Sequence, residues 1–193
     1  DPYHFTIPDT LPSGLYRPLL GLYTFNRPAE RLVATAEDGT KTGDVLLPPV
    51  KIVGKVSTQP RQILQGIIGA FASFQGFSIE PETLILRPAQ TFTLTFFYQA
   101  QQPANESYTR FVHLHSQASG MAAQSDSLPQ GGANPTSAWV AGETVADTLS
   151  LQVGADAAPG RYRLLWGMYD QKANRVPLTN ADDSMAQDNV FVL

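Results

Sequence analysis

The chain has 193 residues, of which 42% are hydrophobic and 16% are charged, so it can bury roughly 70% of the surface of its unfolded state. Its formal net charge is −4 and it carries no block of basic residues, which argues against nucleic acid or anionic membranes as partners. It contains no cysteine, which excludes disulfides, thiolate metal sites and cysteine nucleophiles. We expect no cofactor.

Gln62–Ile79, one of the two longest uncharged runs, contains Gln, Ser and three Gly. It falls short of the roughly 20 mostly apolar residues of a membrane-spanning helix. The chain opens with Asp1-Pro2-Tyr3 rather than with Met, and no signal peptide is visible. We therefore expect a segment that does not itself insert into a membrane and that was cut from a longer protein.

Helix signals are scarce, because 15 proline and 15 glycine residues interrupt the chain at short intervals. In the N-terminal part, the pattern predicts four strands and no long alternating one. They lie at about Tyr3–Ile7, Leu15–Tyr23, Arg31–Ala34 and Val45–Val53.

The second part alternates apolar and polar residues with period two. Within Thr91–Tyr98, Phe92, Leu94, Phe96 and Tyr98 fall on one face, as a half-buried strand requires. Six more segments have strand character: Ala70–Ile79, Tyr108–His115, Met121–Gln124, Thr144–Val153, Arg161–Tyr169 and Asn189–Leu193. Seven short strands separated by turn residues predict an all-β fold, an Ig-like antiparallel β-sandwich over about residues 58–193.

An internal repeat relates the two parts. Gly14–Tyr23 aligns with Gly160–Tyr169 at an offset of 146 residues, with six identities. We therefore interpret residues 1–57 as the last strands of a preceding sandwich unit and residues 58–193 as a complete unit. A partial unit exposes sheet edges and apolar faces, so we expect residues 1–57 to dock on the complete domain or to mediate a homodimer.

The second unit resembles a known family in five stretches. They are Arg87–Tyr98; Tyr108–Leu114; Ala123–Asp126 with Pro129; Asn134–Trp139 with Gly142, Glu143 and Asp147; and Pro159–Leu164 with Gly167–Asp170. These stretches resemble the C-terminal extracytoplasmic β-sandwich of bacterial, Chloroflexi-like membrane glycosyltransferases of the dolichyl-phosphate-mannose mannosyltransferase type, and of related surface proteins. The resemblance implies an extracytoplasmic location and a membrane-anchored parent protein. The family's transferase chemistry lies in membrane-embedded helices that this chain lacks, so we expect no enzymatic activity.

Two histidines provide one candidate site. His113 and His115 lie two residues apart in a predicted strand and therefore project to the same face. With Asp126 they could bind a metal, although a histidine that bonds to Asp126 in a purely structural role is favoured. His113 and Asp126 are therefore candidate ligand-binding residues, as is Tyr108, which opens the same strand.

Trp139 is the candidate for carbohydrate binding, because exposed aromatic rings stack on sugars. It follows a loop rich in Gly, Asn and Pro and either caps the end of the sandwich or lies exposed, and a buried position is favoured. Trp166 lies in an alternating strand and is expected in the core.

Enzymatic motifs are not found. No Gly-x-Ser-x-Gly elbow occurs, and small sandwiches rarely offer the cleft in which two carboxylates cleave a glycoside. The sequence predicts a non-catalytic accessory or interaction module. The alternatives are a carbohydrate-binding module that presents a glycan acceptor and, less favoured, a metal-dependent hydrolase built on His113, His115 and Asp126.

Overall fold

The computed structural model describes residue 2, residues 4–82 and residues 85–193. The described residues are almost entirely β, and every strand pair that they form is antiparallel. Their only helical segments are the short 3-10 turns η1 (Pro129–Gly132), η2 (Thr136–Ala138) and η3 (Gln187–Asn189). None of their helices is long and apolar enough to cross a membrane. The prediction of an all-β sandwich is confirmed.

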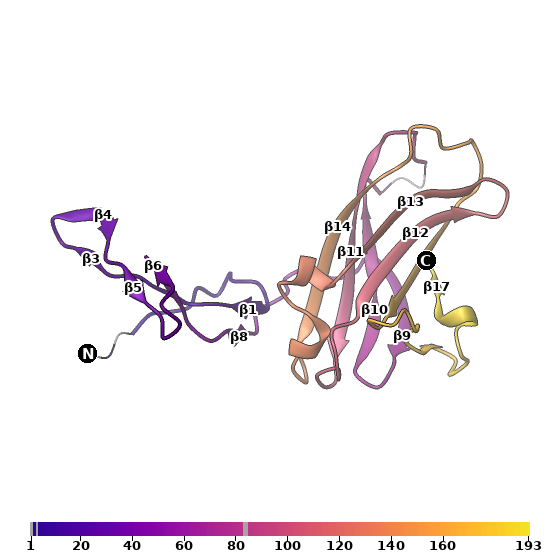
Figure 1. Cartoon of the computed structure of the whole chain (residues 1–193). Coiled ribbons are helices and arrows are strands. Elements are labelled where there is room, and N and C mark those ends of the chain that lie inside the picture. The colour runs from indigo at the N-terminus through magenta and orange to yellow at the C-terminus, as the bar shows by residue number, and fades with distance from the viewer. Residues whose placement is uncertain (1, 3, 83–84) are drawn as a thin grey trace.

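Two sheets form the sandwich, and a shared hydrophobic core lies between them (Figure 1). The first has the strand order β14 (Thr144–Gln152), β11 (Thr91–Ala100), β10 (Ala72–Glu80), β9 (Gln62–Ile68) and β16 (Leu178–Asn180). The second has the order β13 (Gly120–Ser127), β12 (Thr109–Ser116), β15 (Arg163–Tyr169) and β17 (Phe191–Val192).

The alternation in β11 works as predicted. Phe92, Leu94, Phe96 and Tyr98 are all buried in the core, and the Tyr98 ring lies 5.8 Å from that of Trp166 in the opposite sheet. On the other face of the sheet, threonine hydroxyls of β11 pair with hydroxyls of β14. The aromatic side chains of one strand thus hold the two sheets together.

A buried ion pair crosses between the sheets. Arg110 of β12 and Asp147 of β14 are at most 1% exposed, and the Arg110 Nε lies 2.9 Å from Asp147 Oδ2. Arg110 also donates to Ser127 Oγ at 2.6 Å, and Asp147 accepts the backbone N–H of Gln130 at 2.7 Å. The two opposite charges compensate each other's burial, and Ser127 and Gln130 add hydrogen bonds, although Arg110 Nη1 has no hydrogen-bond partner among the described residues.

Several sequence predictions need correction. The expected strand Leu15–Tyr23 is divided among β1 (Gly14–Tyr16), β2 (Leu19–Leu20) and β3 (Tyr23–Thr24). The expected strand Arg31–Ala34 is divided between the end of β4 (Arg27–Arg31) and the start of β5 (Ala34–Thr35). Strands β9 and β16 were not predicted, because their patterns are short or interrupted by Gln and Gly. Residues 4–7 form no strand, and Tyr3 lies outside the described residues. The expected strand Val45–Val53 is divided into β7 (Val45–Leu46) and β8 (Val50–Ile52) by Pro48-Pro49, which cannot donate ladder hydrogen bonds.

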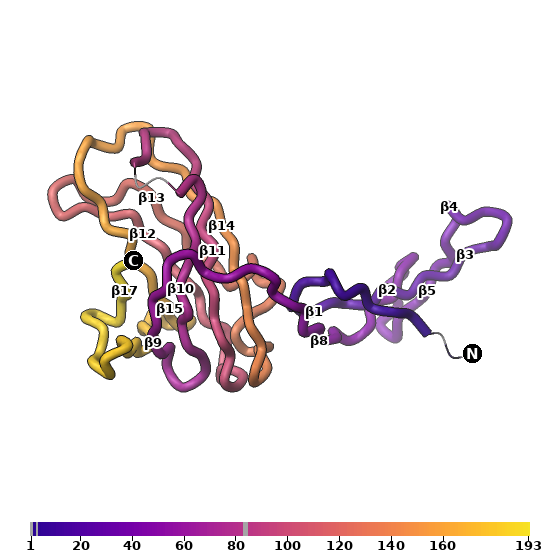
Figure 2. Tube along the Cα trace, turned by 180° about the vertical axis from the view of Figure 1, so that it is seen from behind, coloured from indigo at the N-terminus to yellow at the C-terminus, as the bar shows by residue number. Residues whose placement is uncertain are grey.

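Residues 4–57, called the arm below, form a narrow two-stranded ribbon that projects away from the sandwich (Figures 1 and 2). Its pairs are β1 (Gly14–Tyr16) with β8, β2 (Leu19–Leu20) with β7, β3 (Tyr23–Thr24) with β4 (Arg27–Arg31), and β5 (Ala34–Thr35) with β6 (Lys41–Thr42). Of the 21 large apolar side chains that are exposed in the described residues, 15 belong to the arm. The arm therefore has local pairing but no core of its own.

Replacing Asp147 with alanine should destabilise the sandwich by about 3–5 kcal/mol, because Arg110 would stay buried without its counter-charge. Urea unfolding of the purified chain measures the change. Asp156→Ala, an exposed aspartate substituted in the same way, should cost less than about 0.5 kcal/mol. Equal effects of the two substitutions would contradict the role assigned to the ion pair.

Candidate functional site

The arm meets the sandwich at Lys51, the central residue of β8. Its Nζ lies 2.6 Å from Asn134 Oδ1 and 2.8 Å from Glu143 Oε1. The two acceptors are almost completely buried, whereas the Lys51 side chain remains 17% exposed. We call Lys51, Asn134 and Glu143 the junction.

The sandwich side of the junction is preorganised. Asn134 Nδ2 donates to Glu143 Oε1 at 3.0 Å, and the backbone N–H of Val140 donates to Glu143 Oε2 at 3.1 Å. The indole of Trp139 donates to the Asn134 carbonyl at 3.0 Å, which holds this loop in place. Three donors including Lys51 therefore surround the carboxylate, so its burial is compensated.

The arm is also tied to the same loop through its backbone. The N–H of Leu15, in β1, donates to the carbonyl of Ala133 at 2.8 Å. Gly14 lies so close to that carbonyl that an added Cβ would approach it to 3.0 Å. Both strands at the base of the arm thus contact the loop that precedes β14, and these contacts restrain the arm's direction.

Trp139 requires a correction as a ligand-binding candidate. It has no exposed surface and stacks on Tyr98, with ring centroids 5.3 Å apart. Its ring therefore cannot stack on a sugar, and the favoured interpretation as a buried cap at the end of the core is confirmed.

His113 and Asp126 do come together on the surface of the four-stranded sheet. His113 Nε2 lies 3.4 Å from Asp126 Oδ1, and the Tyr169 hydroxyl donates to Asp126 Oδ2 at 3.0 Å. Burial, and then the bond to Asp126, raise the pKa of Tyr169. The expected His113–Asp126 contact is confirmed.

The metal-binding alternative is not supported by this geometry. His115 lies beyond a register shift in β12 and has Met121 and Arg163 as its cross-strand neighbours. Among the residues that the structure describes, no three His, Cys, Asp or Glu side chains form a group that could hold a metal ion. His113, His115 and Asp126, which the hydrolase alternative needs to converge, do not form such a group among the described residues.

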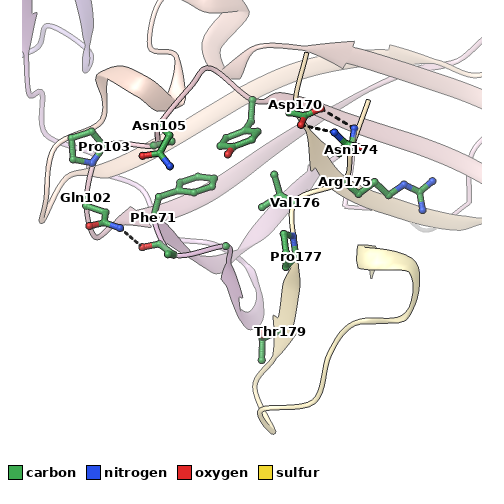
Figure 3. Close-up of a pocket in the computed structure, with 14 residues that line it drawn as sticks. Phe71, Gln102, Pro103, Asn105, Asp170, Asn174, Arg175, Val176, Pro177 and Thr179 are labelled. Carbon is green, nitrogen blue, oxygen red and sulfur yellow. Dashed lines mark hydrogen bonds between the residues drawn. The ribbon is translucent and has the colours of Figure 1, made fainter. Parts of the chain in front are cut away.

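Tyr108 borders a cavity of about 470 Å³ at the end of the sandwich near β16. Its ring stacks on Phe71 with centroids 5.2 Å apart and an interplanar angle of 9°. Burial, and then the negative charges of Glu106 and Asp170, raise the pKa of Tyr108. Figure 3 shows Phe71 between Gln102 and Asn105 on one side and Asp170 and Asn174 on the other.

The polar wall of this cavity is organised by Asp170. Hydrogen bonds from Asn174, and then from the backbone N–H of Lys172, lower its pKa. One Asp170 oxygen accepts the backbone N–H groups of Lys172 and Asn174, each at 2.8 Å. The cavity lining thus combines the ring of Tyr108 with the polar side chains of Gln102, Asn105, Asp170, Asn174 and Arg175.

A second, larger and more apolar cavity of about 810 Å³ opens between the sheets. Its apolar lining comes from both sheets and from the C-terminal residue: Phe77, Ile79, Leu86, Phe92, Leu114, Tyr162, Leu164 and Leu193. Arg61, Gln62 and Glu82 also line it, and Arg61 pairs with Glu80 and Glu82.

Sequence reasoning missed the junction. Asn134 and Glu143 lie in the stretches that carry the family resemblance, but nothing in the sequence indicated that Lys51 would reach them across more than 80 residues. Phe71 was likewise missed: it was predicted to lie in the strand Ala70–Ile79, whereas it lies in the turn between β9 and β10 and lines the cavity.

Comparison of the chain with protein-family models, with curated proteins and with solved structures finds no match.

Replacing Lys51 with methionine should destabilise the sandwich by about 1–3 kcal/mol, because Glu143 keeps a buried charge without a cationic partner. The double variant Lys51→Met/Glu143→Gln should recover most of that loss. Urea unfolding of the four proteins of this double-mutant cycle gives the coupling energy. A coupling energy near zero would mean that the contact does not join the arm to the sandwich.

Proposed function

We propose that the chain is a non-catalytic interaction module of a larger extracytoplasmic protein, and that the junction holds the arm and the sandwich at a defined angle. The observation that carries this proposal is the insertion of the Lys51 ammonium between two buried acceptors, Asn134 and Glu143. A flexible linker would have no need of a buried carboxylate, since burying a charge is costly unless it is paired.

Two further features support the proposal. The arm exposes a concentration of large apolar side chains, which marks interaction surfaces in soluble proteins. The resemblance of the sandwich to domains attached to bacterial membrane glycosyltransferases and surface proteins supplies the proposed location, outside the cytoplasm, and the proposed parent. In that setting the module is a spacer or a docking element beside the catalytic or anchoring part.

The absence of cysteine permits a direct test of the angle. Spin labels on Lys41→Cys, in the arm, and Gln117→Cys, in the sandwich, report one distance by pulsed electron paramagnetic resonance. We expect a narrow distance distribution, which Lys51→Met should broaden at least twofold.

The matched control is Lys55→Met, which removes an exposed lysine four residues further along the chain and should leave the distribution narrow. A distribution that is already broad with Lys51 present would show that the arm moves freely, and the spacer proposal would fail.

Carbohydrate binding is the second candidate function. It is favoured by the cavity in which Tyr108 stacks on Phe71 beside the exposed amides of Gln102, Asn105 and Asn174. Polar amides beside an apolar platform match the two kinds of surface that a sugar ring presents.

Ligand-detected NMR of the chain against a panel of neutral glycans tests this candidate. Binding by one class of glycan should fall at least tenfold in Asn105→Ala and in Tyr108→Ala. Tyr23→Ala, which removes an exposed tyrosine from the arm, should bind normally. No signal from the whole panel, or equal losses in all three variants, would remove the candidate.

A further inference from the structure

The arm reproduces part of the hydrogen bonding of the last strands of the sandwich. The pairs Leu19–Leu46 and Leu20–Val45 have the same register as Leu165–Val192 and Trp166–Phe191, and every one of these residues is displaced by 146 positions. At the same offset, Leu47 donates to the Pro18 carbonyl at 2.9 Å, as Leu193 does to that of Leu164.

The tyrosine of each copy fixes the approach to its strand in the same way. The Tyr16 hydroxyl donates to the Pro12 carbonyl at 2.9 Å, and the Tyr162 hydroxyl donates to the Ala158 carbonyl at 2.8 Å. Both bonds span four residues, and the two tyrosines are again 146 positions apart.

The correspondence continues, at an offset of 144, through the next hairpin. Ala36 N–H donates to Thr40 O at 2.9 Å, and Asn180 N–H donates to Ser184 O at 2.8 Å. Each of these hydrogen bonds closes a turn. The two turns have a positive φ at equivalent positions, Gly39 in the arm and Asp183 in the sandwich. In both turns an aspartate, Asp38 or Asp182, accepts the N–H two residues later.

The two copies differ in what covers them. Trp166 and Met168 are completely buried in the sandwich, whereas their counterparts Leu20 and Leu22 are 51% and 63% exposed. The same holds for Val176 and Phe191 against Leu32 and Val45. In the sandwich, these positions are covered because β12 pairs with β15, β9 pairs with β16, and the first sheet packs across the core.

The first residues of the arm extend the correspondence backwards. At the offset of 146, Phe5 and Ile7 stand where Leu151 and Val153 stand at the end of β14. Leu151 and Val153 are buried, whereas Phe5 and Ile7 are exposed. The arm thus carries the apolar pattern of the end of β14, but without the partner strand β11 beside it.

We infer that the apolar face of the arm is the core face of a second sandwich, and that its partner is a preceding polypeptide segment with counterparts of β9 to β14. In the sandwich those strands come immediately before the copied region in the sequence, which favours a partner in the same polypeptide over a second chain. The inference rests on the proposed function in treating the chain as an interaction module. Its test is separate, because spin-label distances across the junction do not depend on what covers the arm.

The test adds the missing strands in register. Residues 58–146 of this chain are fused directly before Asp1. This junction keeps the register of the repeat, because Asp1 aligns with Asp147 at the offset of 146. Hydrogen exchange followed by mass spectrometry should show arm amides exchanging at least 100-fold more slowly in the extended chain than in the 193-residue chain. Leu20→Asp should abolish this protection, whereas Leu19→Asp, equally exposed but on the opposite face of the strand, should not.

A second extended chain tests whether the shapes of the arm side chains alone prevent packing against the added strands. It carries Leu20→Trp, Leu22→Met and Val45→Phe, which restore the residues that fit β9 to β14 in the sandwich. If the arm remains as fast to exchange in both extended chains as in the 193-residue chain, the inference is overturned. A second result would also overturn it: the 193-residue chain sediments as a dimer, and Leu20→Asp removes the protection of the arm amides from hydrogen exchange in that dimer. The partner would then be a second copy of the chain.

Discussion

The contact of Lys51 with Asn134 and Glu143 is the interaction on which the arrangement of the molecule depends. The ribbon of the arm is narrow and makes no core with the sandwich, so its direction relies on a few contacts at its base. An ammonium group shared by two buried acceptors is more directional than an apolar contact of the same size. Its strength comes from the low exposure of Glu143, where a charge without a partner is costly.

A buried ion pair also fixes the arrangement of two strands inside the sandwich. Arg110 and Asp147 place opposite charges between the sheets, and each also makes a hydrogen bond to a neutral group, of Ser127 and Gln130 respectively. Such a pair adds little net stability over an apolar core, but it penalises any arrangement that separates the two strands. In both places the protein uses one buried carboxylate to select a single geometry between two β elements.

The arm shows that strand pairing and core formation are separable. Its register and turn geometry match those of the last strands of the sandwich, although its inward-facing residues have nothing to pack against. Local signals, such as the tyrosine bonded to a carbonyl four residues back and the aspartate in the turn, are therefore sufficient to specify the hairpin. Burial, and with it most of the stability, requires strands from elsewhere.

The β class, the inward face of β11 and the repeat could be predicted from the sequence, because alternation and turn residues are local properties of the chain. The contact between His113 and Asp126 was also predicted correctly from the sequence. The sequence favoured a buried Trp139, but it did not predict that Tyr108 stacks on Phe71 beside a cavity or that Lys51 joins the arm to Glu143. Each of these depends on contacts between residues far apart in the chain, and no periodicity along the sequence encodes which distant residues will meet.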